Sequence, residues 1–189
     1  PVAPPPLPPE PVAPPPPPPQ PVPLAAPPDA VLRELALRAL DTAKFAGAAY
    51  ADVRIMRNRS QTVATRERRV QALADSETMG FGVRTLVDGA WGFAASNELT
   101  PFEVDRVAHQ AVAQARANRA ALVRPVTLAP ATPTPDGRWR SPIEVDPFTI
   151  PIEDKIALLL AANEAALGVP GARFVNSAMS FFRGDKTYA

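Results

Sequence analysis

Histidine, cysteine and clustered carboxylates are the side chains that most often bind metals or carry nucleophilic and acid–base chemistry, and this chain has few of them. It contains one histidine, His109, and no cysteine, which excludes thiolate catalysis, a disulfide framework and a cysteine-ligated metal. A zinc site needs at least three protein ligands, and neither an HExxH nor an HExxxH spacing occurs. We therefore assign no catalytic residue, no metal ligand and no cofactor-binding residue to the chain.

The single histidine is best interpreted as a surface residue. At 100° per residue, His109 projects away from the apolar stripe of its predicted helix, one turn after Asp105. A surface Asp–His pair is the simpler interpretation, and a metal or catalytic role is the alternative. Ser60, Ser76 and Ser96 have no histidine placed beside them by the sequence, so a serine triad has no support.

Four glycines, Gly80, Gly82, Gly89 and Gly92, invite comparison with a nucleotide-binding loop. An anion cradle of that kind needs a helix N-terminus directly after the glycines, and none is predicted there. Glycines at alternate strand positions more often permit a helix or loop to pack closely on a sheet. The sequence therefore favours a structural role for these glycines.

The charge balance argues against a dedicated nucleic-acid binder, because the net charge is +1 and phosphate neutralisation needs a concentrated basic face. Arg66, Arg68 and Arg69 cluster, but Glu67 interrupts them, so a solvated hairpin tip is preferred over a nucleic-acid patch. No stretch approaches the ~20 apolar residues of a bilayer span. We expect no nucleic-acid partner and no membrane span.

Proline content divides the chain. Residues 1–28 hold 17 of the 26 prolines, and proline fixes φ and removes a backbone donor, so a disordered, extended tether is predicted there. Its PxxP spacings leave docking on an SH3-like groove as the alternative. A first domain is expected over residues 29–123, a Pro-rich linker over 124–142, and the start of a second, incomplete region over 143–189.

An amphipathic helix is predicted directly after the tether. Asp29 stands where an N-cap belongs, and Gly47 is available to end the helix. Its apolar residues recur at helical spacing: Leu32, Leu35, Ala36, Ala39, Leu40 and Ala43.

From Tyr50 the period changes to that of β-strands. A hairpin is expected at Glu67-Arg68, and Asp88-Gly89 supplies a tight reversal. We predict an antiparallel meander of four or five strands, drawn from residues 50–55, 61–65, 70–73, 79–87 and 90–96.

The second helix has the clearest start signal, since Thr100-Pro101-Phe102-Glu103 combines a capping box with proline at the first helical position. It is expected to end near Leu122. Its predicted buried stripe is Val104, Val107, Ala108, Ala111 and Ala115.

A third helix is predicted over residues 152–167, with Gly168 at its C-terminus. Residues 173–182 then have the character of a strand, Gly184-Asp185 of a turn, and residues 186–189 of a return strand. The inward side chains of the helix are expected to be Ile152, Ile156, Leu159, Leu160 and Asn163. The fold class is therefore α+β: an antiparallel sheet packed with amphipathic helices, preceded by a disordered Pro-rich arm and followed by the start of a second, truncated α+β region.

Residues 51–100 resemble the N-terminal domain of the TldD/PmbA family of zinc metallopeptidases. The resemblance is carried by the order of elements and by the pattern GxGxRxxxxGxxGFA. A later segment, residues 144–167, resembles the start of the family's second region, where an Asp-Pro-Phe and a Pro-x-x-x-Lys precede a helix. The matching signature residues, to which we assign a structural role, are Gly80, Gly82, Arg84, Gly89, Gly92 and Phe93.

The resemblance implies a peptidase that admits unfolded or extended peptides into an enclosed chamber and cleaves them with a zinc held by an HExxxH helix and a downstream cysteine. It also implies homo- or hetero-oligomers in which a zinc-bearing TldD-type subunit pairs with a zinc-free PmbA (TldE) type. The chain ends before the place of the HExxxH motif, so zinc is expected only in the full-length active subunit. The family implies a cytoplasmic location, whereas the Pro-rich tether favours an exported or envelope-anchored one.

Two functional hypotheses follow. The first is the non-catalytic N-terminal part of such a peptidase, serving as scaffold, peptide-holding and subunit-contact domain. The alternative is a non-enzymatic binding or regulatory module, including a zinc-free partner subunit. An available sheet edge can bind an extended chain through main-chain hydrogen bonds, or pack against a partner subunit, and both remain open.

Arg84 carries the sharpest structural prediction. Alternation places it on the strand face shared with Gly80, Gly82 and Leu86, and we expect a helix to cover that face. A partly buried guanidinium then needs a carboxylate or carbonyl partner. The candidate acids are Asp52, Asp75, Glu77 and Asp88, and a solvent-facing arginine is the alternative.

Overall fold

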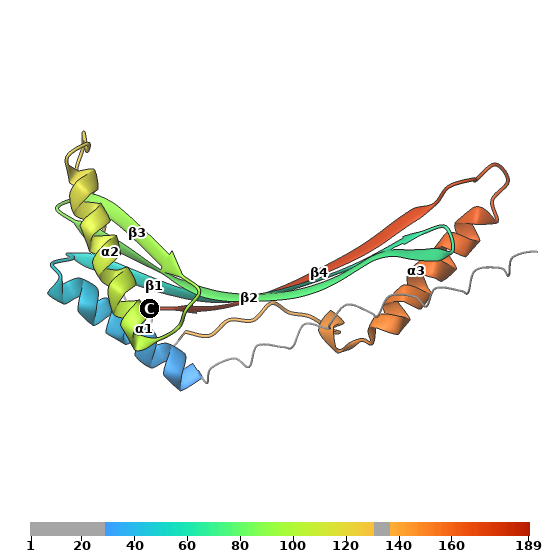
Figure 1. The fold of residues 1–189 in the computed structure, drawn as a ribbon, viewed down its shortest axis with the longest axis horizontal. Coiled ribbons are helices and arrows are strands. Elements are labelled where there is room, and N and C mark those ends of the chain that lie inside the picture. Colours follow the sequence, from blue (N-terminus) through green and yellow to red (C-terminus); the bar gives the residue numbers. More distant parts are fainter. Residues whose placement is uncertain (1–28, 131–136) are drawn as a thin grey trace, which may run out of the picture.

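The computed structural model describes residues 29–130 and 137–189, so the predicted tether at residues 1–28 lies outside the described residues. The described residues form a sheet of four antiparallel strands in the order β3-β2-β1-β4, with three α-helices and one 3₁₀ helix (Figure 1). The predicted α+β class is confirmed. In chain order the elements are α1 (Asp29–Phe45), β1 (Tyr50–Arg66), β2 (Arg69–Val87), β3 (Ala90–Ser96), α2 (Pro101–Arg119), η1 (Pro147–Thr149), α3 (Ile152–Leu167) and β4 (Asn176–Tyr188).

The sheet is long and curved, with α1 and α2 at one end and α3 at the other (Figure 1). All three helices cover the same face. In β1 the odd-numbered Val53 and Ile55 join the core under α1 and α2, while Gln61 and Thr65 lie under α3. Because alternate strand residues point to the same side, the even-numbered residues of β1 define a second face that no described helix covers. We call it the helix-free face.

The main hydrophobic core lies between α1, α2 and the sheet. The predicted apolar positions of both helices are buried there, except Leu40, which is partly buried against the core. Val53, Ile55, Phe81, Val83 and Val87 of the sheet complete the core. Thr100 caps α2 as expected, because its Oγ1 accepts from the Glu103 backbone N–H at 3.3 Å. The Glu103 carboxylate does not complete the capping box; it accepts from Arg106, which lowers its pKa to about 2.

The meander has fewer and longer strands than predicted. β1 and β2 run unbroken for 17 and 19 residues, so the separate runs predicted within each are single strands. The polar residues between those runs do not form loops, because they pair across the strands: Arg57 with Glu77, and Arg59 with Asp75. Three strands form the meander, and β4 adds the fourth.

The turn predicted at Gly184-Asp185 was wrong. β4 pairs with β1 in one continuous register from Arg54 opposite Tyr188 to Arg66 opposite Asn176, passing straight through Gly184. The turns predicted at Glu67-Arg68 and Asp88-Gly89 are present, with φ of 48° at Glu67 and Asp88 and 78° at Gly89. A local Gly-Asp signal is overridden where β1 supplies a partner for every residue of the strand. None of the helices in the described ranges is long and apolar enough to cross a bilayer.

Candidate functional site

Three glycines of the signature stand where a larger side chain would collide with the backbone or an aromatic ring. A Cβ on Gly92 would lie 2.0 Å from the Ala111 carbonyl oxygen, so Gly92 lets α2 approach the sheet. On the helix-free face, a Cβ on Gly82 would lie 2.7 Å from the ring of Phe93, which lies across that glycine. Gly89 provides the positive φ of the β2–β3 turn. The structure thus distributes the signature over both faces of the sheet and one turn.

Arg84 binds Asp52, one of the four predicted partners. Arg84 Nη2 and Nε lie 2.6 and 2.7 Å from Asp52 Oδ2. The Asp52 side chain is only 3% exposed, whereas that of Arg84 is 40% exposed. The expectation that a helix covers Arg84 was wrong, because the helices lie on the opposite face. Its guanidinium instead lies 4.6 Å from the ring centroid of Trp91.

A second arginine shares this carboxylate. Arg54 Nε lies 3.5 Å from Asp52 Oδ1, and its guanidinium lies 5.6 Å from the Tyr188 ring. The Tyr50 and Tyr188 hydroxyls are 3.2 Å apart, and this hydrogen bond, with partial burial, raises the pKa of Tyr50 to about 12. We call Tyr50, Asp52, Arg54, Arg84, Trp91 and Tyr188 the Arg–aromatic cluster. It holds two guanidinium groups for one carboxylate.

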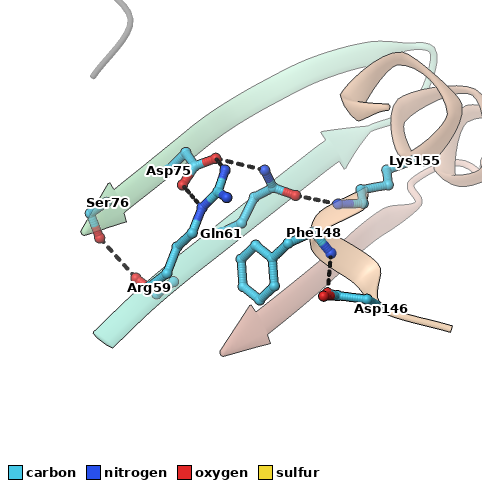
Figure 2. Close-up of polar contacts among 8 residues, drawn as sticks. Arg59, Gln61, Asp75, Ser76, Asp146, Phe148 and Lys155 are labelled. Atoms are coloured by element: carbon cyan, nitrogen blue, oxygen red, sulfur yellow. Dashed lines mark hydrogen bonds and ion pairs between the residues drawn. The ribbon is translucent and has the colours of Figure 1, made fainter. Parts of the chain in front are cut away.

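A different polar network lies on the helix-covered face, where α3 and η1 meet the sheet (Figure 2). Lys155 is 3% exposed; its Nζ donates to Gln61 Oε1 and lies 4.6 Å from the Phe181 ring centroid. Gln61 Nε2 donates to Asp75 Oδ2 at 2.8 Å, and Arg59 forms two hydrogen bonds with the same carboxylate at 2.9 and 3.1 Å. The hydrogen bonds from Arg59 are the main reason that the pKa of Asp75 is lowered.

Phe148 of η1 lies between two arginines. The guanidinium groups of Arg59 and Arg183 are each 4.9 Å from its ring centroid. Asp146 caps η1 by accepting from the Phe148 N–H at 2.9 Å and also pairs with Arg183. The backbone hydrogen bond is the leading cause of the lowered pKa of Asp146. Asp-Pro-Phe and the lysine of Pro-x-x-x-Lys therefore meet on one patch of the sheet, which we call the Lys155 network.

Asn163 fixes the far end of α3 to the β1–β2 hairpin. It is fully buried and donates to Thr65 Oγ1 at 3.1 Å and to the Glu67 carbonyl at 2.8 Å. Its Oδ1 accepts from Ser177 Oγ at 2.5 Å. Asn163 was expected to point inward and does so, while Ile152, Ile156 and Leu160 are only partly buried.

Neither residue type nor spacing marked Lys155, Arg59 or Gln61 as chemically distinctive in the sequence. One signal was available: Lys155, Leu159 and Asn163 follow each other at i, i+4 and i+8, so a lysine and an asparagine share the apolar stripe of α3. Polar residues on a buried stripe require buried partners. Gln61, two residues from the Asp75-paired Arg59, is such a partner.

The outer edge of β4 is the other feature of the site. Val53 and Ala189 exchange both backbone hydrogen bonds, at 2.8 and 3.0 Å. In an antiparallel ladder such pairs recur at every second residue, so the odd-numbered residues of β4 bind β1. The N–H and C=O groups of its even-numbered residues point outward. Nothing in the described ranges pairs with that edge.

Within residues 29–130 and 137–189, no three histidine, cysteine or carboxylate side chains are grouped so as to hold an ion. His109 is exposed. Asp105 accepts hydrogen bonds from Arg38 and Thr42 of α1, and the charge of the nearby His109 adds a smaller effect to the lowered pKa of Asp105, in keeping with the predicted surface pair. What the arrangement offers chemically is main-chain hydrogen bonding at the β4 edge, beside cationic and aromatic side chains.

Residues 51–115 match the family model described as PmbA/TldA metallopeptidase domain 1. No curated protein matches the chain.

Similar folds occur in solved structures. A proposed modulator of DNA gyrase from Bacteroides thetaiotaomicron VPI-5482 matches with a TM-score of 0.62 and 22% identity, over 82% of this chain and 35% of that one. TldE from Thermococcus kodakarensis matches with a TM-score of 0.56 and 14% identity, over 84% of this chain and 35% of that one. A proposed modulator of a DNA gyrase from Thermotoga maritima MSB8 matches with a TM-score of 0.59 and 13% identity, over 83% of this chain and 35% of that one. The chain thus spans about a third of the length of these structures.

Proposed function

Because the chain belongs to the TldD/PmbA family, with that family's first domain at residues 51–115, we propose that it is the non-catalytic N-terminal part of a peptidase that acts on unfolded or extended peptides. In this role the chain serves as a scaffold, contacts another subunit and holds the peptide. In the family that this chain resembles, the zinc is held by an HExxxH motif, and that motif does not occur in these 189 residues. We place the protein in the cytoplasm on the same family ground.

The observation that carries peptide holding is the outer edge of β4. Its outward N–H and C=O groups belong to the even-numbered residues of a 13-residue strand. An extended segment can add to such an edge through main-chain hydrogen bonds, which are largely independent of side-chain identity. That mode suits a domain that meets unfolded chains of varied sequence.

The rest of the molecule supports a rigid edge. β4 is held by its full-length register with β1, by Arg183 against Asp146, and by Ser177 against Asn163. The edge is therefore formed before any peptide arrives, which reduces the entropy lost on binding.

Gly184 offers a matched pair of variants for the test. Its outward N–H is lost in Gly184→Pro and kept in Gly184→Ala, while both add the same Cβ, which would meet Phe182 Cε1 at 3.2 Å and Asn58 Oδ1 at 3.4 Å. Neither change touches the β1–β4 hydrogen bonds, because these involve odd-numbered residues of β4. Proline is tolerated at such edge positions.

The assay is fluorescence anisotropy of a labelled, neutral Thr/Val/Gln peptide of 12 residues titrated with the 189-residue chain. We expect saturable binding that Gly184→Pro weakens by at least about tenfold, the effect of losing ~1.4 kcal/mol, and that Gly184→Ala leaves nearly unchanged. Sedimentation of the same samples reports self-association. Peptide holding would be refuted if the chain bound no peptide but formed a dimer that Gly184→Pro dissociates. That result would assign the edge to a second copy of the chain.

A further inference from the structure

The first strand in the sheet order, β3, lacks the features that usually protect an edge strand. Its seven residues read AWGFAAS, with two aromatic side chains and neither a charge nor a proline. Its register with β2 contains no bulge. Charged residues, prolines and bulges are the common means of keeping an edge from pairing with a strand of another molecule, and short uncharged segments with high β-propensity are prone to such pairing.

The outward backbone groups of β3 follow from its hairpin with β2. Ala90 lies opposite Val87 across the two-residue turn at Asp88-Gly89, so these two residues form the first hydrogen-bonded pair of the hairpin. Such pairs recur at every second residue of an antiparallel ladder. The even-numbered residues of β3 therefore bind β2, and the N–H and C=O groups of its odd-numbered residues point away from the sheet.

Two amide side chains of α2 occupy these outward groups. Asn118 Nδ2 donates to the Trp91 carbonyl at 2.8 Å, and the Phe93 N–H donates to Gln114 Oε1 at 3.4 Å. Four helical residues rise about 6 Å, and two strand residues rise about 6.8 Å. The spacing of the two amides on α2 thus matches the spacing of the outward groups on β3.

Gly92 brings α2 within reach of the strand backbone. A Cβ on Gly92 would lie 2.0 Å from the Ala111 carbonyl oxygen and 2.5 Å from the Ala115 nitrogen, so the helix crosses β3 in close contact (Figure 1). At this short range even asparagine, with a single methylene group, reaches the strand backbone. The signature glycine therefore has a second consequence besides packing.

We propose that Gln114 and Asn118 close the β3 edge against pairing with an extended strand of another molecule, including β3 of a second copy. A strand added to β3 would have to displace both amides. It would also have to pass beside α2, which is held in place by its buried apolar stripe. The contacts that carry this proposal lie between residues 90 and 119, and they are separate from peptide holding at β4.

The test removes both amides from the 189-residue chain. Alanine forms a helix at least as well as glutamine or asparagine, so Gln114→Ala/Asn118→Ala opens the edge without weakening α2. The control is His109→Ala, which truncates an exposed side chain beside Asp105, on the part of α2 that contacts α1.

Aggregation is followed by light scattering and thioflavin T fluorescence at equal protein concentrations. We expect the double variant to aggregate at least about threefold faster than wild type. Asn118→Ala alone should lie between them, because it removes the shorter of the two hydrogen bonds. His109→Ala should match the wild type.

Ala95→Pro identifies the surface responsible. It removes an outward N–H of β3 and leaves the β2–β3 hydrogen bonds intact, because these involve even-numbered residues of β3. Proline is tolerated at such edge positions. Added to the double variant, Ala95→Pro should return the aggregation rate to near that of wild type.

Each result decides the matter. Aggregation rates of the double variant and of Asn118→Ala that equal the wild-type rate would overturn the proposal. Faster aggregation that Ala95→Pro fails to slow would also overturn it, because association would then proceed through another surface or through unfolded chains. Urea denaturation of each variant identifies which of these two it is.

Discussion

At the scale of single residues, Asp52 shows how a polar group is kept on a sheet face without a covering helix. Its side chain is almost fully buried by its neighbours on the sheet, and the charge is balanced by Arg84 at 2.6 Å. The Trp91 ring in turn lies against that guanidinium. Removing one partner of a buried ion pair leaves the other charge uncompensated, which costs more than losing an exposed pair.

Arg84→Ala is therefore expected to destabilise the fold by about 2 kcal/mol, since Arg54 remains near enough to compensate Asp52 in part. The matched control is Arg54→Ala on the same face, whose 3.5 Å contact and exposed side chain predict about 0.5 kcal/mol or less. Urea denaturation of the three proteins measures both. Equal midpoints for wild type and Arg84→Ala would contradict this account.

At the scale of elements, α3 is attached to the sheet mainly through polar groups. Its buried stripe is Lys155, Leu159 and Asn163, and only Leu159 is apolar. The helix is therefore positioned by specific hydrogen bonds to Gln61, Thr65 and the hairpin carbonyl of Glu67. Buried polar networks of this kind specify one arrangement of the elements, provided that each member is satisfied.

Lys155 tests this attachment. Lys155→Ala should cost about 2 to 3 kcal/mol, because it leaves both a cavity and an unpaired Gln61 carbonyl. Lys155→Met keeps most of the volume and should cost about 1 kcal/mol. Amide hydrogen exchange should show faster opening of α3 in the alanine variant, with α1 and α2 unaffected. Uniform loss of protection throughout the chain would contradict a local role.

The dependence of stability on pH in the acid range tests the contribution of the Asp75 carboxylate to folding. Its pKa is lowered from 3.8, chiefly by hydrogen bonds from Arg59. A lowered folded pKa gives stability that is complete above the unfolded value and is lost as the pH falls through the folded one. The contribution of Asp75 should therefore be complete above about pH 5 and be lost progressively as the pH falls below the ordinary value of 3.8.

Other carboxyl groups with a lowered pKa, such as Asp146, contribute to the pH dependence of stability in the same pH range. The effect of Asp75 is therefore measured as the difference in stability between wild type and Asp75→Asn. Asp75→Asn should be less stable than wild type at pH 7 by about 1 kcal/mol, and the gap should close towards pH 3. Thermal melts at several pH values follow it. A gap that is constant with pH would refute the assignment.

At the scale of the whole molecule, helices cover one face of a curved sheet at both ends, while no helix of residues 29–130 or 137–189 covers the other face (Figure 1). The helix-free face, the Arg–aromatic cluster and the outer edge of β4 adjoin one another at Tyr188. The described residues therefore form a curved platform, and the edge at β4 is where we propose that extended peptides bind.

The 189-residue chain is accordingly expected to hydrolyse no peptide and to bind zinc no better than a generic protein surface. The reason is the ligand inventory, one histidine and no cysteine. Isothermal calorimetry with zinc, on wild type and His109→Ala, measures this. Stoichiometric binding that His109→Ala abolishes would contradict it.

Local sequence patterns determined much of this fold. Helical spacing and the Thr100 cap located the helices, and Asp88-Gly89 located a turn because few other pairs adopt positive φ easily. The alternation around Arg84 gave the residues that share its face, and its observed partner Asp52 was one of four candidate acids. The family signature was also legible in the sequence. Each of these features depends on residues close together in the chain.

Only the tertiary structure decided which face of the sheet the helices cover, how far β1 and β2 extend, and where Lys155 lies. Alternation divides a strand into two faces without saying which one is packed. Arg59 and Asp75 look like loop residues until they are seen to pair across strands. β4 passes through Gly184 because β1 offers a partner there. These outcomes depend on contacts between distant segments, and such contacts override local preference.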